Sequence, residues 1–306
     1  MEICNKIING DCIEVFKTLE EGSVACCITD PPYNYEFIGR KWDDKEIKRR
    51  TDRVQEGSST LVKHIPYGSG LAGGVRNERW YEKNRLNDLE YIKWCEDWGK
   101  GLYKICKAGA PVAVFNSSRS IAHVQIALEN AGFYTRDIMV YKRHSGIPKG
   151  LNLEAKLKKM GHDDAENWKG WHSAFRNEWE AILLVQKPLL NNYWETLQAT
   201  GVGVFKTINE NGTFQSNILE NYSNKNKEEK FDHCTVKPLE LIMKLIDMFV
   251  PPSDENIIID PFAGSGTTLV AAKILGFNYL GIEIEKEYFP LIEKRLLKTQ
   301  KRNTMF

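Results

Sequence analysis

The stretch IIIDPFAGSGTT at residues 257–268 decides the fold. It begins with an apolar, β-branched run that ends in an acid, Asp260, and this run predicts a buried strand of a parallel sheet. Two glycines, Gly264 and Gly266, then allow a tight turn and a close approach of the backbone to a ligand, and a helix is predicted from about Thr267. The order of strand, acid, glycine turn and helix is typical of a site that seats a nucleotide-like cofactor at a strand end.

The same stretch argues against a dinucleotide. The G-x-G-x-x-G fingerprint needs a third glycine where Leu269 stands, so NAD binding is disfavoured. An acid is expected about 20 residues further on, and Glu283 ends the predicted strand 278–284, where its carboxylate can accept both ribose hydroxyls. A cofactor with a ribose but no pyrophosphate fits this pattern, which makes S-adenosylmethionine the obvious candidate, with Asp260 or its loop holding the methionine end. A generic turn is the alternative.

A second strand end, near the start of the chain, carries an unusual tetrapeptide. The apolar run VACCIT (24–29) predicts another buried strand, and Asp30, Pro31, Pro32 and Tyr33 follow it directly. Prolines fix φ and remove backbone donors, so a rigid turn is the plain interpretation, but it leaves the acid and the tyrosine unexplained. Because ligands of open α/β sheets bind at the carboxyl ends of the strands, this tetrapeptide is expected to line the ligand crevice.

Strand and helix signals alternate along the rest of the chain and predict a doubly wound, mostly parallel sheet covered by helices. Two polar stretches, 34–87 and 187–234, interrupt the alternation. Loops of this length are usually lids or binding loops, and poorly structured surface segments are the alternative. Further strands are predicted at 3–8, 111–115, 133–141 and 180–186, and helices at about 88–107, 118–131, 238–249 and up to 299.

Composition sets outer limits on the protein. A chain of 306 residues with 42% hydrophobic content can form one large α/β domain with a sizeable core. No leader with a basic and an apolar region and no membrane span is visible, which predicts a cytoplasmic protein. The seven cysteines contain no C-x-x-C pair and the six histidines show no ligand spacing, so reduced thiols and no metal site are expected. A net charge of +1 does not decide for or against nucleic acid, because binding needs a basic face.

Two motifs in one order carry a family resemblance. DPPYN at 30–34, followed far downstream by DPFAGSGTT at 260–268, resembles the beta-class amino-methyltransferases of DNA, in which the catalytic motif precedes the cofactor motif. HCTVKP (233–238) resembles a family segment of the form H-P-T-x-K-P that helps to close the cofactor pocket, although Cys234 replaces the proline. Smaller matches resemble phage- and prophage-type members and lie at 37–43, 145–153 and 176–188.

The resemblance implies a single Rossmann-like methyltransferase domain over 1–306, with a catalytic half at 1–186 and a cofactor half at 235–306. It implies S-adenosylmethionine as cofactor and double-stranded DNA as partner, with 34–87 as a lid that contacts DNA and 187–234 as a target-recognition insertion. The implied catalytic residues are Asp30, Pro31, Pro32 and Tyr33. The implied cofactor-binding residues are Asp11, Asp260, Phe262, Gly264, Gly266, Glu283 and Lys237.

The expected reaction is site-specific methylation of the exocyclic N6 of adenine after base flipping, because cytosine members of the family more often carry serine at the position of Asp30. N4 of cytosine is the alternative, followed by RNA or a protein glutamine as substrate and by a catalytically silent DNA-binding module. No nuclease motif is visible, so a restriction partner would be a separate chain. Monomer and homodimer both remain open.

Three basic segments are candidates for phosphate contacts or for solvated surface. Residues 40–53 carry seven basic and four acidic side chains, and residues 142–159 carry six basic and one acidic. Both segments follow strands whose ends frame the pocket, so both are candidate DNA contacts. The third segment, 293–302, is expected to be solvated surface. Base edges would be read by polar side chains of the two long insertions.

Overall fold

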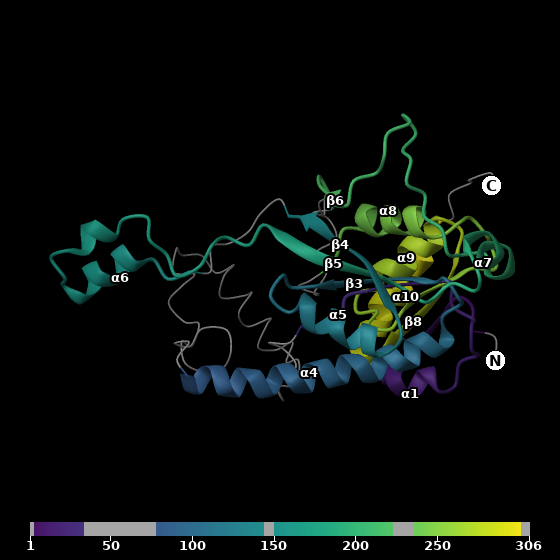
Figure 1. Ribbon diagram of the computed structural model, residues 1–306, viewed down its shortest axis with the longest axis horizontal. Coiled ribbons are helices and arrows are strands. Elements are labelled where there is room, and N and C mark those ends of the chain that lie inside the picture. The colour runs from purple at the N-terminus through teal and green to yellow at the C-terminus, as the bar shows by residue number, and fades with distance from the viewer. Residues whose placement is uncertain (1–2, 34–77, 144–149, 223–235, 301–306) are drawn as a thin grey trace.

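The computed structural model describes residues 3–33, 78–143, 150–222 and 236–300 (Figure 1). Within these residues the strands form one eight-stranded sheet of order β1-β8-β7-β2-β3-β5-β4-β6. All neighbours are parallel except β5, which runs antiparallel to both β3 and β4, so the prediction of a mostly parallel sheet is confirmed. The strands are β1 (Lys6–Asn9), β2 (Cys26–Thr29), β3 (Pro111–Asn116), β4 (Tyr134–Lys142), β5 (Trp179–Gln186), β6 (Ile218–Leu219), β7 (Ile257–Asp260) and β8 (Asn278–Glu283).

Helices cover the two faces of the sheet. On one face α4 packs against both α1 and α5, and on the other α8 and α10 each contact α9 (Figure 1). Every residue of β2, β3 and β7 is buried, because these central strands are covered on both sides, and this explains their unbroken apolar runs. The helices are α1 (Cys12–Phe16), α4 (Glu78–Ile105), α5 (Ile121–Asn130), α6 (Leu153–Met160), α7 (Tyr193–Thr200), α8 (Leu239–Phe249), α9 (Thr267–Ile274) and α10 (Phe289–Lys298).

The first and last parts of the chain meet at the centre of the sheet. Strand β2 pairs with β7 in parallel, with Cys27 opposite Ile259, and pairs with β3 on its other side. The segment that leads to Asp30 therefore ends beside the segment that leads to the glycine turn. Because parallel strands end at the same edge of a sheet, the two motifs recognised in the sequence follow strand ends at one edge of it.

The two predicted insertions contain regular structure where they are described. Helix α4 begins at Glu78, ten residues before the predicted start at 88. The earlier start is not predicted because the first turns of the helix are polar and show no apolar periodicity. Helix α7 and strand β6 both lie within 187–234. Residues 34–77, which hold most of the predicted lid and the basic run 40–53, lie outside the described part.

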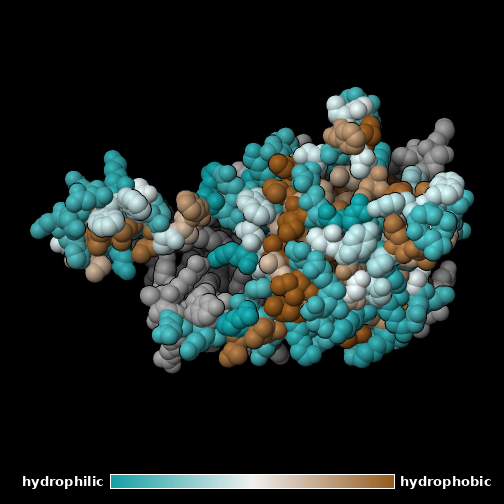
Figure 2. Space-filling model, in the orientation of Figure 1, coloured by the Kyte–Doolittle hydropathy of each residue, from teal (hydrophilic) through white to brown (hydrophobic). Residues whose placement is uncertain are grey.

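An extension between β4 and β5 carries α6 away from the body of the molecule (Figure 1). This helix buries none of its residues, and it is stabilised by its caps: the side chain of Asn152 accepts a hydrogen bond from the amide of Ala155, and Gly161 ends the helix at φ 78°. Large aromatic side chains on the extension are exposed, among them Trp171 and Phe175. Figure 2 shows hydrophobic surface on this extension. Packing against the core of the protein therefore contributes little to the stability of the extension.

The cysteines that the structure describes are unpaired, and all but Cys4 are buried, as predicted for reduced thiols. Burial raises the pKa of Cys12, Cys95 and Cys106 to about 12, so these thiols stay protonated at neutral pH. Among the helices described, none is long and apolar enough to cross a membrane.

Candidate active site

Four acidic residues that the sequence singled out gather at one edge of the sheet. Asp260 and Glu283 are the last residues of β7 and β8, and Asp30 and Asp11 follow the ends of β2 and β1. The register explains the gathering, since Asn9 lies opposite Glu283 in the β1–β8 pair. The structure therefore brings the predicted catalytic and cofactor residues to the same strand ends.

The turn after β2 is anchored to the core by hydrogen bonds. The hydroxyl of Tyr91 on α4 donates to the carbonyl of Pro32 at 3.0 Å, and it accepts from Nδ2 of Asn116 at the end of β3 at 2.9 Å. Tyr91 and Asn116 are fully buried, so this chain of hydrogen bonds is shielded from water. Inside the turn, the Tyr33 hydroxyl donates to Oδ1 of Asp30 at 3.1 Å. The position of Asn116 at a strand end could have identified it from sequence, whereas Tyr91 in mid-helix gives no local signal.

The other carboxylate oxygen of Asp30 is bound by a lysine from the far end of the chain. The ammonium of Lys237 donates a charge-assisted hydrogen bond to Oδ2 of Asp30, and Oε2 of Glu180 lies 3.5 Å from the same ammonium. The sequence assigned Lys237 to the cofactor pocket, and the structure places its ammonium on Asp30. Glu180, which lies at the start of the antiparallel strand β5, was not identified from the sequence.

Burial and charge act in opposite directions on this pair. The side chains of Asp30 and Lys237 are 24% and 12% exposed. Removal from water raises the pKa of Asp30, and the adjacent ammonium opposes part of that rise. Burial lowers the pKa of Lys237, but the carboxylates of Asp30 and Glu180 outweigh burial, so the net pKa of Lys237 is raised. The lysine is therefore a cation at neutral pH.

Asp260 shapes the glycine turn from inside. Its Oδ1 accepts hydrogen bonds from the Thr29 hydroxyl at 2.7 Å and from the amide of Phe262 at 3.1 Å. Burial raises the pKa of Asp260 to about 6, and the hydroxyls of Thr29 and Thr268 and the Phe262 amide hold it below the value that burial alone would give. The carboxylate is thus committed to the turn and to the neighbouring strand.

Glu283 receives two backbone amides. Gly264 donates to its Oε2 at 2.6 Å and Glu285 donates to its Oε1 at 2.8 Å, so the glycine turn and the end of β8 are fixed to one carboxylate. The amide of Gly10 donates to the Glu283 carbonyl at 3.1 Å, and this places Asp11 beside the same strand end. Asp11 itself is exposed, and its Oδ1 accepts the amide of Ile13 as the N-cap of α1.

Gly266 is required by helix packing. Its φ is +75°, and a Cβ built there would lie 2.6 Å from Cγ2 of Ile292 on α10. The sequence predicts a close approach to a ligand at this glycine, whereas the close approach that the structure shows is to helix α10 of the protein itself. At Gly264, φ is also positive, at 49°.

The expectation that 293–302 is solvated surface is wrong for Arg295. This side chain is buried, and its Nη1 donates to the Ser265 carbonyl at 2.5 Å and to the Thr267 hydroxyl at 3.0 Å. The guanidinium thus braces the turn between β7 and α9 from behind. A buried arginine on a helix with several exposed charges cannot be recognised from local sequence, because only the tertiary fold supplies its partners.

Phe262 forms an aromatic wall beside the turn. Its ring lies 5.5 Å from the ring of Trp94 and 5.7 Å from that of Trp98, both on α4, measured between centroids. Such tilted and edge-on contacts are favourable for aromatic pairs. The helix that anchors Pro32 therefore also supports the glycine turn.

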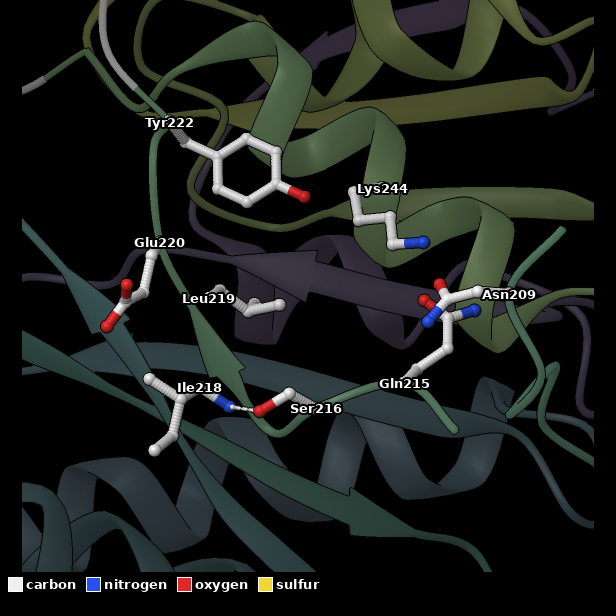
Figure 3. Close-up of a pocket in the computed structure, with 8 residues that line it drawn as sticks. All are labelled: Asn209, Gln215, Ser216, Ile218, Leu219, Glu220, Tyr222 and Lys244. Carbon is white, nitrogen blue, oxygen red and sulfur yellow. Dashed lines mark hydrogen bonds between the residues drawn. The ribbon is translucent and has the colours of Figure 1, made fainter. Parts of the chain in front are cut away.

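A polar hollow of about 500 Å³ lies apart from these residues, between β6 and α8 (Figure 3). Most of its lining comes from the 187–234 stretch, and the remaining contribution is Lys244 of α8. The amide of Ile218 donates to the Ser216 hydroxyl in its wall at 3.0 Å. It contains none of the predicted site residues, and its lining is Asn209, Gln215, Ser216, Ile218, Leu219, Glu220, Tyr222 and Lys244.

Comparison with known proteins places this site in a family. The sequence profile of the DNA methylase family of N6 and N4 methyltransferases matches residues 24–294. The type II methyltransferase M.HindIII of Haemophilus influenzae is 31% identical over 303 residues, which cover 95% of this chain and 94% of the relative. M.HinfI of the same species is 27% identical over 300 residues, which cover 96% and 69%.

Solved structures share the fold. A putative DNA modification methylase of Thermus thermophilus, complexed with S-adenosyl-L-methionine, aligns with a TM-score of 0.56 at 18% identity over 96% of this chain and 94% of that one. The cytosine-N4-specific PvuII DNA methyltransferase aligns with a TM-score of 0.59 at 15% identity over 98% and 88%. The extent of the family match and the identity to M.HindIII show that this chain belongs to the S-adenosylmethionine-dependent N6/N4 amino-methyltransferases of DNA.

Proposed function

We propose that this chain methylates the exocyclic N6 of adenine in duplex DNA. The observation that carries the proposal is the place of Asp30, at the end of β2 and beside the β7 end that holds the cofactor turn. A carboxylate there can accept a hydrogen of the amine that is to be methylated. An aspartate at this position favours adenine, because cytosine members of the family more often carry serine.

Two acceptors would prepare the amine. The lone pair of an exocyclic amine is delocalised into the ring, so the nitrogen is a poor nucleophile until that pair is localised. The Asp30 carboxylate and the Pro31 carbonyl would each accept one amine hydrogen. The prolines restrict the turn, and the Tyr91 hydroxyl holds the carbonyl of Pro32, so the acceptors are positioned before the base arrives.

Tyr33 would stack on the base. The reacting atom cannot be reached inside a duplex, so the base must be flipped out at a cost of a few kcal/mol. Stacking on an aromatic side chain contributes on the order of 1–3 kcal/mol per base. The hydrogen bond from the Tyr33 hydroxyl to Asp30 ties the ring to the carboxylate that would accept the amine hydrogen.

The residues at the ends of β7 and β8 fit the cofactor. When bound, S-adenosylmethionine supplies the electrophilic methyl group. Glu283 would accept the ribose hydroxyls, since two amides fix its carboxylate and each oxygen keeps a further lone pair. Asp11, exposed beside the same strand end, would face the adenine of the cofactor. Asp260 would act through the turn that it holds, and Phe262 would form the wall.

The extension between β4 and β5 and the 187–234 insertion are the proposed DNA-contacting parts. Lys156 and Lys159 of α6 are exposed, as phosphate contacts require. Arg143 differs, because its guanidinium pairs with Glu180 at 3.1 Å although its side chain is 42% exposed. Asn209 and Gln215 line the polar hollow of Figure 3. Their amide nitrogens donate to the carbonyls of Phe214 and Lys206, so their amide oxygens are the groups proposed to accept from base edges.

Incubation with unmethylated duplex DNA and labelled S-adenosylmethionine tests the proposal directly. The DNA is digested to nucleosides, and the labelled product is identified by mass spectrometry. N6-methyladenine is expected. N4-methylcytosine would show that the target base is cytosine, and the proposed acceptors would then serve its amine. If the protein binds the cofactor but no methylated nucleoside forms, RNA, a protein glutamine or a silent DNA-binding role would be favoured.

A further inference from the structure

Glu180, which neither motif of the sequence contains, belongs to a row of alternating charges that is exposed at its Arg143 end, where the side chain is 42% exposed, and becomes more buried toward Lys237. Arg143 lies 3.1 Å from Oε1 of Glu180, and Lys237 lies 3.5 Å from Oε2 of Glu180 and contacts Asp30. The side chain of Glu180 is 13% exposed. The row runs from the base of the β4–β5 extension to the carboxylate that would receive the target amine.

Asp30 has both oxygens engaged in this structure. The Tyr33 hydroxyl donates to Oδ1, and the Lys237 ammonium donates to Oδ2. The second contact is the stronger one, because both partners are charged. Oδ2 keeps a further lone pair that can accept an amine hydrogen from a flipped base, but the ammonium bound there draws charge from the carboxylate and makes it a weaker acceptor.

A buried lysine cannot simply be released from its carboxylate. An ammonium left without a partner in a desolvated site is strongly unfavourable. The rings of Phe115 and Tyr33, with centroids 5.2 and 5.9 Å from the ammonium, attract a cation but do not accept its hydrogens as a carboxylate does. Glu180 offers a carboxylate within reach, and its other oxygen is fixed by Arg143, so it is already oriented to receive the ammonium.

We infer that Glu180 is a positioning residue that takes over the Lys237 ammonium when the target amine binds Asp30. No covalent bond changes in this step, and the lysine keeps its proton throughout. The inference rests on the proposed function, because it assumes that Asp30 accepts an amine hydrogen. Glu180 does not contact the substrate, so its effect is transmitted through Lys237.

The test is a double-mutant cycle on the rate of methyl transfer in a single turnover, with enzyme in excess over duplex DNA. Glu180→Gln preserves the shape and removes the charge that would receive the ammonium. We expect it to slow methyl transfer about 10- to 100-fold and to leave the affinities for S-adenosylmethionine and DNA within about twofold of wild type. In a Lys237→Met background the same substitution should have no further effect, because the lysine through which Glu180 acts is gone.

Glu96→Gln serves as the matched control, since Glu96 pairs with Lys100 on the outer surface of α4 and should leave the rate unchanged. A wild-type rate in Glu180→Gln would overturn the inference, and so would an equal loss in both backgrounds. If the glutamine variant does not fold, Glu180→Asp keeps the charge and withdraws it from the ammonium. Glu180→Asp must then slow methyl transfer when Lys237 is present and must have no effect when it is added to Lys237→Met. Any other result overturns the inference. Failure of the proposed function is recognised separately, since wild type itself would then give no methylated nucleoside.

Discussion

The Thr29 hydroxyl donates a hydrogen bond of 2.7 Å to Oδ1 of Asp260, and the two residues are 231 positions apart in the chain. The bond joins the end of β2 to the end of β7, and both side chains are buried. The turn after β2 and the glycine turn after β7 are therefore joined by a hydrogen bond between two polar side chains.

Replacement of Thr29 by valine should weaken both turns. Valine keeps the shape but leaves the buried Asp260 carboxylate short of a donor, which typically costs about 1–3 kcal/mol of the free energy of unfolding. Thr29→Ser keeps the hydroxyl and is the control. Chemical denaturation at pH 7 should show the valine variant clearly less stable than the serine variant, and equal stabilities would contradict the role of the bond.

Stability should depend on pH through Asp260. Burial raises its pKa from 3.8 to about 6, so the folded protein binds this proton more tightly than the unfolded chain does. The free energy of unfolding should therefore fall as pH rises from about 4 to 6, by on the order of 3 kcal/mol, and this contribution stays constant above that range. Asp260→Asn cannot titrate at this position, so its free energy of unfolding should not fall for this reason between about pH 4 and 6. The difference between its free energy of unfolding and that of wild type should therefore shift in favour of the variant as pH rises through this range. Asp247→Asn, on the surface of α8, controls for the loss of an acidic charge, and parallel curves for Asp260→Asn and wild type would refute the prediction.

Asp30 should tolerate an amide better than truncation. Asparagine retains an oxygen that can accept an amine hydrogen, whereas alanine retains none. We expect Asp30→Ala to abolish methyl transfer and Asp30→Asn to keep part of it, because hydrogen-bond acceptance matters more than proton abstraction. Rates from labelled S-adenosylmethionine decide the matter, and wild-type activity in both variants would exclude this mechanism.

Tyr33 should act mainly through its ring. Tyr33→Phe loses one hydrogen bond to Asp30 but keeps the ring that would stack on the base, so it should slow turnover only a few-fold. Tyr33→Ala also loses the stacking surface and should be severe. A fluorescent base analogue at the target position reports flipping independently of chemistry. If phenylalanine proves as damaging as alanine, the hydroxyl is the working part of the side chain.

Arg295 should support cofactor binding from behind the turn. Arg295→Met removes the donor that satisfies the buried carbonyl of Ser265, so the turn should loosen, with a loss of about 1–3 kcal/mol in stability. Calorimetry should show weaker binding of S-adenosylmethionine. The adjacent Lys294 is exposed, and Lys294→Met should leave both quantities unchanged. An unaltered affinity in Arg295→Met would show that the turn does not depend on this brace.

Local pattern was sufficient for the central strands and their ends. The strand at 257–260 is predicted with the bounds that it has, because a fully buried strand must be an unbroken apolar run bounded by a turn. The start of the helix after Gly266 is also predicted, because the glycine turn marks it. The polar first turns of α4 and the short strand β6 are not predicted, because neither has an apolar periodicity.

By itself the sequence determined the fold class, the family and the acids at the strand ends, because the carboxyl ends of parallel strands meet at one edge and strand-ending residues can be read from local pattern. Only the tertiary structure decided which side chains meet across the chain. Lys237 binds Asp30 over 207 residues, Tyr91 anchors Pro32 over 59, and Arg295 reaches Ser265 over 30. The physical reason is that such contacts depend on the packing of helices and antiparallel strands around the sheet, and local sequence pattern does not encode that packing.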